Sequence, residues 1–520
     1  MLRVRRCYRT LARMFALLLW GGSDASHIGF ALPPFSPAGP MMPVVHGCLD
    51  SGHKVTVFAH SATVAKMRPL APGAEFVDVG PAQRPELDEW SQGFILSMPY
   101  TVMPLLSIPA VLVGLDTAIG WPLAQATLPE LRRRRPDVLC TCNLLSSVYA
   151  AGEAAGVPVV GLSFGPQVWM TILDAPWSSA PALGSWYSER EIAGNLALTA
   201  LNTAARAMSV PFCVVGSVMY NLRRLRLGLT TLQSDAFDSM WSNPLVVPTL
   251  PELLAGHHLM STPNMVMAGM YDHPALAGVS LGKSAQQEQI TAWLDAKFAS
   301  GTEVVYAAFG SEVTMDNRRL KLFMEAFRAG NITVLWALKK VPADLDASPN
   351  VFVTPWAPQK VVLEHPAVKV FLSHGGTNSV RESLVAGTPL LIMPVMPDCP
   401  SVAAMHEELG VALRLDKNGI TPEVVVGAVR KLSSEGYQAR AREVRELNER
   451  HASLARAVEV VEAAARRGLQ HEASAETGYL PVWQSVVMLF FIGNLCSRAM
   501  RRCCCCCCRP RSGAVKSKLE

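Results

Sequence analysis

The sequence predicts an α/β protein with two domains built from parallel strands and helices. Its 520 residues exceed what one hydrophobic core ordinarily organises. In the C-terminal half, an apolar run ending at Leu372 resembles a buried parallel strand; a turn over 373–379 and helical spacing from Val380 to Ala386 follow it. Near the N-terminus, His27–Leu32 and Gly52–Phe58 are typical of strands, with a helix predicted over roughly Met42–Ser51 between them.

Composition limits the classes of partner. Hydrophobic residues make up 50% of the chain and charged residues 17%, which favours contact with a membrane. The net charge of +5 is small and lies partly in the tails, so we expect no nucleic-acid partner. Six of the 13 cysteines are consecutive, at Cys503–Cys508, and none has the spacing of a zinc site or a disulfide framework. We therefore expect no metal site.

The first 25 residues are typical of a targeting segment. Arginines between Arg3 and Arg13 precede the apolar run Met14–Trp20, and small residues follow up to Ala25. We predict a signal peptide over residues 1–25, cleaved near Ala25. An uncleaved anchor or an amphipathic transit helix is the alternative.

Two later uncharged or nearly uncharged runs have the composition of membrane segments but contain prolines. Gly93–Leu115 is interrupted three times, which favours broken helices lining an apolar cleft over helices dipping into a lipid interface. Leu201–Met219 is interrupted by Pro211 and is predicted to be a buried helix rather than a span.

The stretch Trp356–Cys399 carries the clearest chemical signal. Its strand, glycine turn and helix start bring unpaired backbone N–H groups and the positive end of the helix dipole together, where glycines let a ligand approach. A diphosphate is the natural guest of such a junction.

These 44 residues closely resemble the signature of the UDP-glycosyltransferases. That family moves a sugar from a UDP-sugar to a small, usually lipophilic acceptor. The resemblance implies two facing Rossmann-like domains, the GT-B fold, with the UDP-sugar as co-substrate and no other cofactor. It implies that Trp356 stacks on uracil, that Gln359 bonds the base and ribose edge, and that Glu382 takes the ribose hydroxyls. His374 would meet the diphosphate within the turn formed by Gly375 and Gly376, with Asn378 and Ser379 on the phosphates and Ser311 reaching the diphosphate from the end of the strand 304–311. Asp398 would hold sugar hydroxyls.

The acceptor side departs from the family pattern. Pro40 stands where the family has the histidine that deprotonates the acceptor, and Cys142 stands where it has the aspartate that orients this histidine. The catalytic residues are therefore unknown, with a base relocated to His46 or Asp50 as an alternative. Cys399 also replaces the usual sugar-reading residue after Asp398, so the donor sugar cannot be transferred from the family.

The resemblance also implies the division of the chain. We expect an acceptor-binding domain over residues 27–270, a linker over 271–284 and a UDP-sugar-binding domain over 285–470. The apolar run 479–496 is predicted to be a transmembrane helix, with an interfacial helix as the alternative, and residues 497–520 a cytosolic tail. Within that tail, Cys503–Cys508 suggest S-acylation, and Lys516 and Lys518 match a retrieval signal of the endoplasmic reticulum.

Together these features predict an inverting, metal-independent transferase that moves a sugar from a UDP-sugar to a lipophilic acceptor such as a sterol, lipid or phenol. The predicted location is the membrane of the endoplasmic reticulum, with a single span and lumenal catalytic domains, where Asn331 is a usable glycosylation site. The alternative is a UDP-sugar-binding protein that has lost catalysis and acts as a regulatory or assembly partner.

Overall fold

The computed structural model describes most of residues 25–467. The described ranges are 25–34, 38–82, 96–100, 104, 110–163, 181–182, 185–233, 242–254, 264–276, 284–310, 315–339, 341, 348–396 and 398–467. Nearly all of the predicted signal peptide, Ser311, the predicted helix 479–496 and the tail 497–520 lie outside these ranges. Among the described helices, none combines the length and apolar composition needed to cross a membrane.

The N-terminal lobe contains a seven-stranded parallel sheet with the order β3-β2-β1-β4-β5-β6-β7. The chain runs outward in both directions from β1 and β4, and ligands of parallel sheets bind outside the carboxyl ends of strands at such a reversal. The strands are β1 (His27–Ala31), β2 (Lys54–Ala59), β3 (Glu75–Asp78), β4 (Val138–Cys142), β5 (Val159–Leu162), β6 (Leu245–Val247) and β7 (Met265–Met267).

The C-terminal lobe contains a six-stranded parallel sheet with the order β10-β9-β8-β11-β12-β13. Its reversal lies between β8 and β11, the strand that ends in the glycine turn. The strands are β8 (Val304–Ala308), β9 (Thr333–Ala337), β10 (Val351–Thr354), β11 (Val368–Ser373), β12 (Leu390–Ile392) and β13 (Ala412–Arg414).

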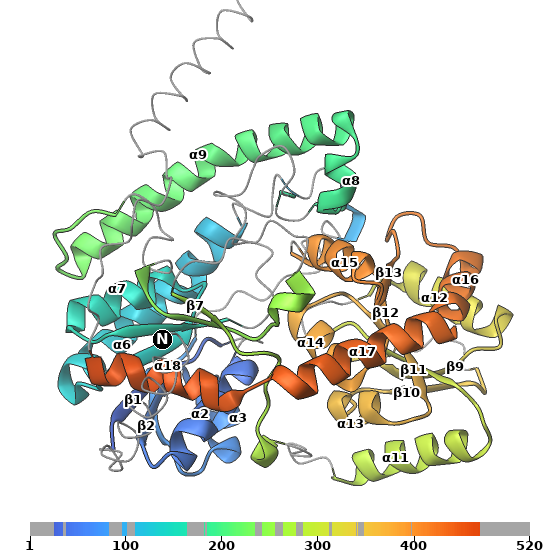
Figure 1. Cartoon of the computed structure of the whole chain (residues 1–520), viewed down its shortest axis with the longest axis horizontal. Coiled ribbons are helices and arrows are strands. Elements are labelled where there is room, and N and C mark those ends of the chain that lie inside the picture. Colours follow the sequence, from blue (N-terminus) through green and yellow to red (C-terminus); the bar gives the residue numbers. More distant parts are fainter. Residues whose placement is uncertain are drawn as a thin grey trace, which may run out of the picture.

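Helices accompany both sheets (Figure 1). In the N-terminal lobe they are α2 (Ala38–Asp50), α3 (Ser61–Met67), η1 (Arg68–Leu70), η2 (Ala110–Gly120), α6 (Trp121–Arg134), α7 (Ser146–Ala155), α8 (Glu189–Ala193), α9 (Leu196–Arg226), η4 (Pro251–Leu254) and η5 (Pro274–Leu276). The later helices are α11 (Ser284–Ala299), α12 (Asn317–Ala329), α13 (Gln359–Glu364), α14 (Thr377–Ala386), α15 (Cys399–Glu408), α16 (Pro422–Leu432), α17 (Glu435–His451) and α18 (Leu454–Arg467).

The hydrophobic cores explain the apolar runs of the sequence. Along β11, Phe371 joins the core on one face of the sheet, and its neighbours Val370 and Leu372 join the core on the other face. Successive side chains of a strand point to opposite faces, so a strand covered on both sides must be apolar throughout.

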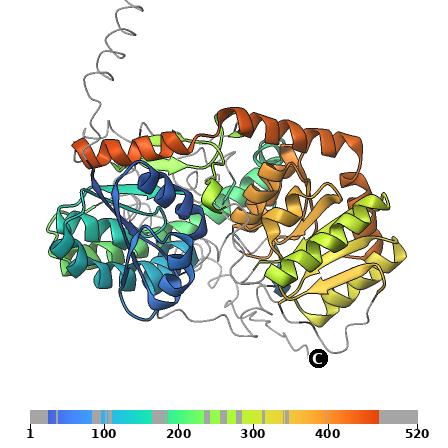
Figure 2. The same ribbon diagram turned by 90° about the horizontal axis from the view of Figure 1, so that it is seen from below.

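The chain connects the two lobes twice, at neighbouring places. Figure 2 shows α17 over the C-terminal lobe and α18 crossing to the N-terminal lobe, where Val458 and Val461 are part of the core. Beside this crossing, the Asn448 side chain accepts a hydrogen bond from Met270 N at 2.8 Å and donates one to Met270 O at 3.2 Å. The first connection, which passes through Met270, is therefore fixed directly to the second, which runs from α17 to α18.

Two details of the sequence prediction were wrong. The helix after β1 was expected to begin near Met42 but begins at Ala38. Pro40 fits its first turn because an N–H group needs no helical partner there, and Pro43 lies inside the helix. The predicted buried helix 201–219 is part of α9, but one of its faces is exposed: Met208 and Val215 are 57% and 49% exposed.

Candidate functional site

The glycine turn lies at the reversal point of the C-terminal sheet. β11 ends at Ser373, and α14 begins at Thr377 with Gly376 as its N-cap residue. Because glycine has no side chain to cap the helix, the first N–H groups of α14 remain available to an anion. Asn378 and Ser379 lie in this first turn, half-buried and buried respectively. The predicted diphosphate site is thus a true strand-to-helix junction.

His374 is packed between two glycines. A Cβ atom on Gly376 would lie 2.4 Å from His374 Nε2, and one on Gly310 would lie 2.7 Å from His374 Cε1. Gly310 follows β8 and has a φ of +72°, which also disfavours other residues. The imidazole therefore occupies the space between the ends of β8 and β11, beside the start of α14. Ser311, the next residue after Gly310, lies outside the described ranges.

A hydrogen-bond network joins the two ends of the predicted nucleoside site. Gln359, the first residue of α13, donates from Nε2 to Glu382 Oε2 at 2.8 Å and to Ser379 Oγ at 3.3 Å. Tyr306 from β8 donates to Gln359 Oε1 at 3.4 Å. The structure thus brings Gln359, Ser379 and Glu382 together, and an amide held beside a carboxylate is suited to a base and a ribose diol.

Trp356 lies between β10 and α13, three residues before Gln359, and is half-buried. Its backbone carbonyl accepts hydrogen bonds of 2.9 Å from Gln286 Nε2 and from Thr354 Oγ1. These bonds fix the backbone that presents the indole, as a stacking platform requires.

Asp398 brings a second carboxylate to the start of α14. It precedes α15, and Thr377 Oγ1 donates to its Oδ2 at 3.5 Å. Burial raises the pKa of Asp398 above its usual range. Cys399 is completely buried, so its thiol packs inside the lobe and is not presented to a ligand. Of these two residues, only Asp398, which is half-buried, keeps surface that a ligand can reach.

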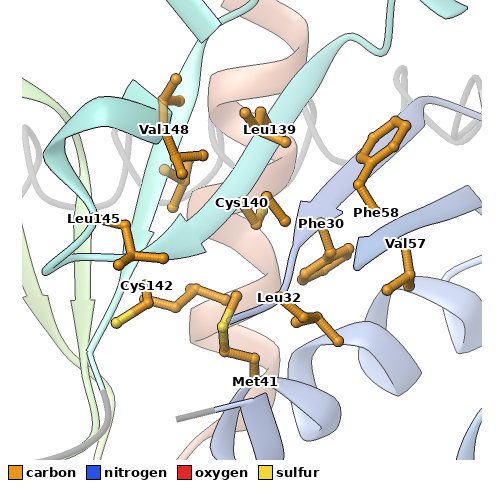
Figure 3. Close-up of a cluster of buried hydrophobic side chains, with 14 of the residues drawn as sticks. Phe30, Leu32, Met41, Val57, Phe58, Leu139, Cys140, Cys142, Leu145 and Val148 are labelled. Carbon is orange, nitrogen blue, oxygen red and sulfur yellow. The ribbon is translucent and has the colours of Figure 1, made fainter. Parts of the chain in front are cut away.

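The reversal point of the N-terminal sheet is apolar where an acceptor base would be expected. Pro40 lies in the first turn of α2, and Cys142 ends β4 with no exposed surface. Figure 3 shows Cys142 and Met41 in one cluster with Leu32 and Leu145. Burial raises the pKa of the Cys142 thiol to about 12, which keeps it neutral at physiological pH.

The two residues considered as relocated bases are engaged elsewhere. His46 Nε2 is 2.7 Å from the Leu70 carbonyl, and its ring stacks on His273 at 4.7 Å. Asp50 Oδ2 is 2.8 Å from His273 Nε2. Asp50 is at the opposite end of α2 from Pro40, about 15 Å along the helix. This geometry does not support either residue as a base beside β4.

Sequence reasoning missed a contact that joins residues of the N-terminal half to the C-terminal lobe. Tyr100 donates from its hydroxyl to Pro394 O at 2.9 Å, and its ring stacks on Trp186 at 4.4 Å. Lys417 Nζ lies 4.8 Å from the Tyr100 ring, and burial lowers the pKa of Lys417 to about 8. Residues about 300 positions apart give no local signal, so only the folded chain reveals this contact.

No group of three or more His, Cys, Asp or Glu side chains with the geometry of a metal site occurs in the described part of the chain. The polar groups that the structure gathers are instead a helix start, an amide and two carboxylates at one edge of the C-terminal sheet.

Comparisons with known proteins agree with this geometry. Residues 231–471 match the model of the family described as UDP-glucoronosyl and UDP-glucosyl transferase. A putative UDP-glucuronosyltransferase, ugt-60 of Caenorhabditis elegans, is 30% identical over 213 residues, which cover 40% of this chain and 41% of the relative. UDP-glycosyltransferase 1 of Phaeomoniella chlamydospora is 32% identical over 31% of this chain and 36% of its own length. The matches thus span about two fifths of these relatives.

The fold similarity extends further than the sequence similarity. The crystal structure of the glycotransferase of kitacinnamycin matches 85% of this chain and 99% of its own with a TM-score of 0.60, at 19% sequence identity. The predicted two-domain GT-B fold with parallel sheets is confirmed at the level of the fold. The predicted C-terminal transmembrane helix stays a prediction.

Proposed function

Because residues 231–471 match the UDP-glycosyltransferase family model, we propose that this chain is a member of that family and a glycosyltransferase that takes its sugar from a UDP-sugar. The observation that carries the proposal is the network of Gln359, Ser379 and Glu382 beside the open start of α14. In this network an amide and a carboxylate, which suit a nucleoside, lie next to a helix start, which suits a diphosphate.

The C-terminal lobe supplies the chemistry of donor activation. Trp356 stacks on uracil, Gln359 bonds the base and ribose edge, and Glu382 accepts from the ribose hydroxyls. His374 and the N–H groups of α14 stabilise the negative charge that develops on UDP as the bond to the sugar breaks, which is an electrostatic rather than a covalent device. Asp398 orients the sugar through its hydroxyls. The reaction needs no metal and inverts the anomeric carbon, because the acceptor attacks opposite the leaving UDP.

The acceptor is a small lipophilic molecule of the sterol, lipid or phenol type. A general base contributes roughly 10²- to 10⁴-fold in rate, and the apolar cluster of Met41 and Cys142 provides none at the reversal point of the N-terminal sheet. An acceptor that is already anionic, such as a carboxylate, needs no base. We therefore expect a carboxylate acceptor to be used better than an alcohol of similar shape.

The same apolar cluster favours a second candidate function. In it, the chain binds the UDP-sugar without transferring the sugar and acts as a regulatory or assembly partner. The two candidates share the donor site and differ only in turnover.

Transfer assays on the purified full-length chain separate the candidates. UDP release is measured with a carboxylate and a phenol acceptor for the native chain, for Pro40→His, and for Pro40→His combined with Cys142→Asp. The single Cys142→Asp variant is the matched control, since it buries a carboxylate without a histidine partner. Native transfer supports the enzyme. Turnover only in the double variant supports the partner function.

We also propose location in the membrane of the endoplasmic reticulum, with both lobes in the lumen. Asn331 is exposed and precedes β9, which makes it accessible for glycosylation. A mass shift that is removed by an endoglycosidase and absent from Asn331→Gln supports this topology. An unmodified Asn331 in cells contradicts it.

A further inference from the structure

Helix α9 has the reverse of the usual amphipathic pattern. A surface helix in water normally turns its charged residues outward. In α9 three of the four charged residues are buried: Arg206 and Arg224 are each 1% exposed and Arg223 is 7% exposed. Arg223 pairs with Asp116 at 2.5 Å, and Arg224 pairs with Glu153 at 2.5 Å. The charges of the helix therefore face the protein.

The outer face of α9 is apolar along its length. Its exposed large side chains are Leu196, Leu201, Met208, Phe212, Val215, Val218, Leu222 and Leu225. On a helical projection these side chains cover an arc of roughly 160° over about 45 Å. The helix contains no acidic residue, and its exposed charge is Arg226 at the C-terminal end. An exposed patch of this size marks an interaction surface.

We propose that this outer face of α9 lies on a lipid bilayer, with its apolar side chains at the level of the headgroups. The alternative of a paired helix from a second copy is disfavoured by the width of the face and by its charges. In a coiled coil, charged residues of both signs border a narrow apolar seam, whereas this face is roughly 160° wide and the helix has no acidic residue to pair across a seam. A broad face without acids, ending in an exposed arginine, instead complements an anionic lipid surface.

The position of α9 fits this assignment. Figure 1 shows α9 along one edge of the molecule, from the N-terminal lobe towards α8 and the C-terminal lobe. α8 contacts the donor lobe, where Glu191 pairs with Arg414 at 3.1 Å. Leu201 lies on the outer face and also lines a small pocket with Trp186 and Tyr100. An acceptor dissolved in lipid would enter the protein through this pocket. That route rests on the proposed function, whereas the bilayer contact does not.

Met208 provides a natural probe of the contact. We expect vesicles of phosphatidylcholine and phosphatidylserine to slow the peroxide oxidation of Met208 several-fold in the full-length chain, as followed by peptide mass spectrometry. The reference is a methionine introduced by Val424→Met, at a position 47% exposed on α16 in the other lobe. Its oxidation should not change. This local readout is independent of any other segment that binds lipid.

Two further outcomes decide the proposal. Equal oxidation of Met208 with and without vesicles, on chains that sediment with the vesicles, overturns it. Protection without vesicles that grows with protein concentration also overturns it, in favour of a second copy. The variant Val215→Glu combined with Leu222→Glu changes two positions that are 49% and 53% exposed, so its fold should be retained, as a circular dichroism spectrum checks. Vesicles should then no longer slow the oxidation of Met208 in this variant, whereas Val424→Glu should leave the protection unchanged. UDP affinity, which reports the proposed donor site, should be the same in all these variants.

Discussion

Gln359 and Glu382 are joined by a 2.8 Å hydrogen bond from the amide Nε2 to the carboxylate Oε2. Gln359 begins α13, which precedes β11 in the chain, and Glu382 lies in α14, which follows β11. The bond sets the orientation of both side chains before a nucleotide arrives. A site prepared in this way loses less side-chain entropy on binding.

Replacing Gln359 by Glu tests this pairing. Two carboxylates would then face each other, and their repulsion raises the pKa of the pair. We expect UDP affinity at pH 7 to fall by about tenfold or more and to recover partly as the pH is lowered towards 5, where one carboxyl gains a proton. Gln359→Leu is the control, because it removes the hydrogen bond without adding charge. Its loss of affinity should not depend on pH, and calorimetric titration with UDP distinguishes the two variants.

Gly376→Ala tests the packing of His374. Gly376 has a φ of −61°, which alanine tolerates, so the effect comes from the contact with the imidazole. We expect a loss of about 1–3 kcal/mol in the free energy of unfolding together with weakened UDP binding. Gly427→Ala, in α16 with open space around it, should be neutral or stabilising. If Gly376→Ala still destabilises the chain in a His374→Ala background, the proposed contact is not the cause.

Gly269→Ala tests the connection between the lobes. Gly269 has a φ of +71°, and an added Cβ would lie 2.5 Å from Ala452 Cα at the start of the second crossing. Backbone cannot yield as a side chain can, so we expect a loss of about 3 kcal/mol or more in urea denaturation. Gly52→Ala shares the positive φ but has open space, and should lose only about 1–2 kcal/mol. Equal losses would mean that the contact with Ala452 has no energetic role.

Asp398→Asn should separate stability from function. Burial raises the folded-state pKa of Asp398 above its unfolded value, so the protonated form is favoured in the folded chain. Ionised Asp398 therefore lowers the free energy of unfolding at pH values above its folded-state pKa. This loss shrinks as the pH falls below the folded-state pKa and is gone below the unfolded-state pKa. We expect Asp398→Asn to be more stable than the native chain at pH 7, with the difference narrowing towards pH 4. Affinity for the UDP-sugar should fall while affinity for UDP alone is retained. A less stable variant at pH 7 would contradict the assignment.

The strand, turn and helix around His374 could be predicted from the sequence because their signals are local. An apolar run, a pair of glycines and helical spacing follow one another within 20 residues, and β11 and α14 lie where this pattern placed them. The resemblance of Trp356–Cys399 to the family signature likewise implied that Gln359 and Glu382 share a site, and the structure joins the two side chains by a hydrogen bond.

The environment of α9 could not be predicted in the same way. Its apolar composition indicated burial, but composition does not say whether protein or another phase covers a side chain. The contacts of Tyr100 with Pro394 and of His273 with Asp50 join segments more than 200 residues apart. Neither contact leaves a periodicity in the sequence, because each depends on how the lobes and their connections are placed.

The most direct test of the donor site is a calorimetric titration of UDP into the purified full-length chain and into Glu382→Ala. The account predicts binding of one UDP to the native chain and a loss of at least about tenfold in affinity in Glu382→Ala. Glu443→Ala, an exposed position on α17 in the same lobe, should bind as the native chain does. A native chain that binds no UDP, or a Glu382→Ala variant that binds it equally well, would contradict the account.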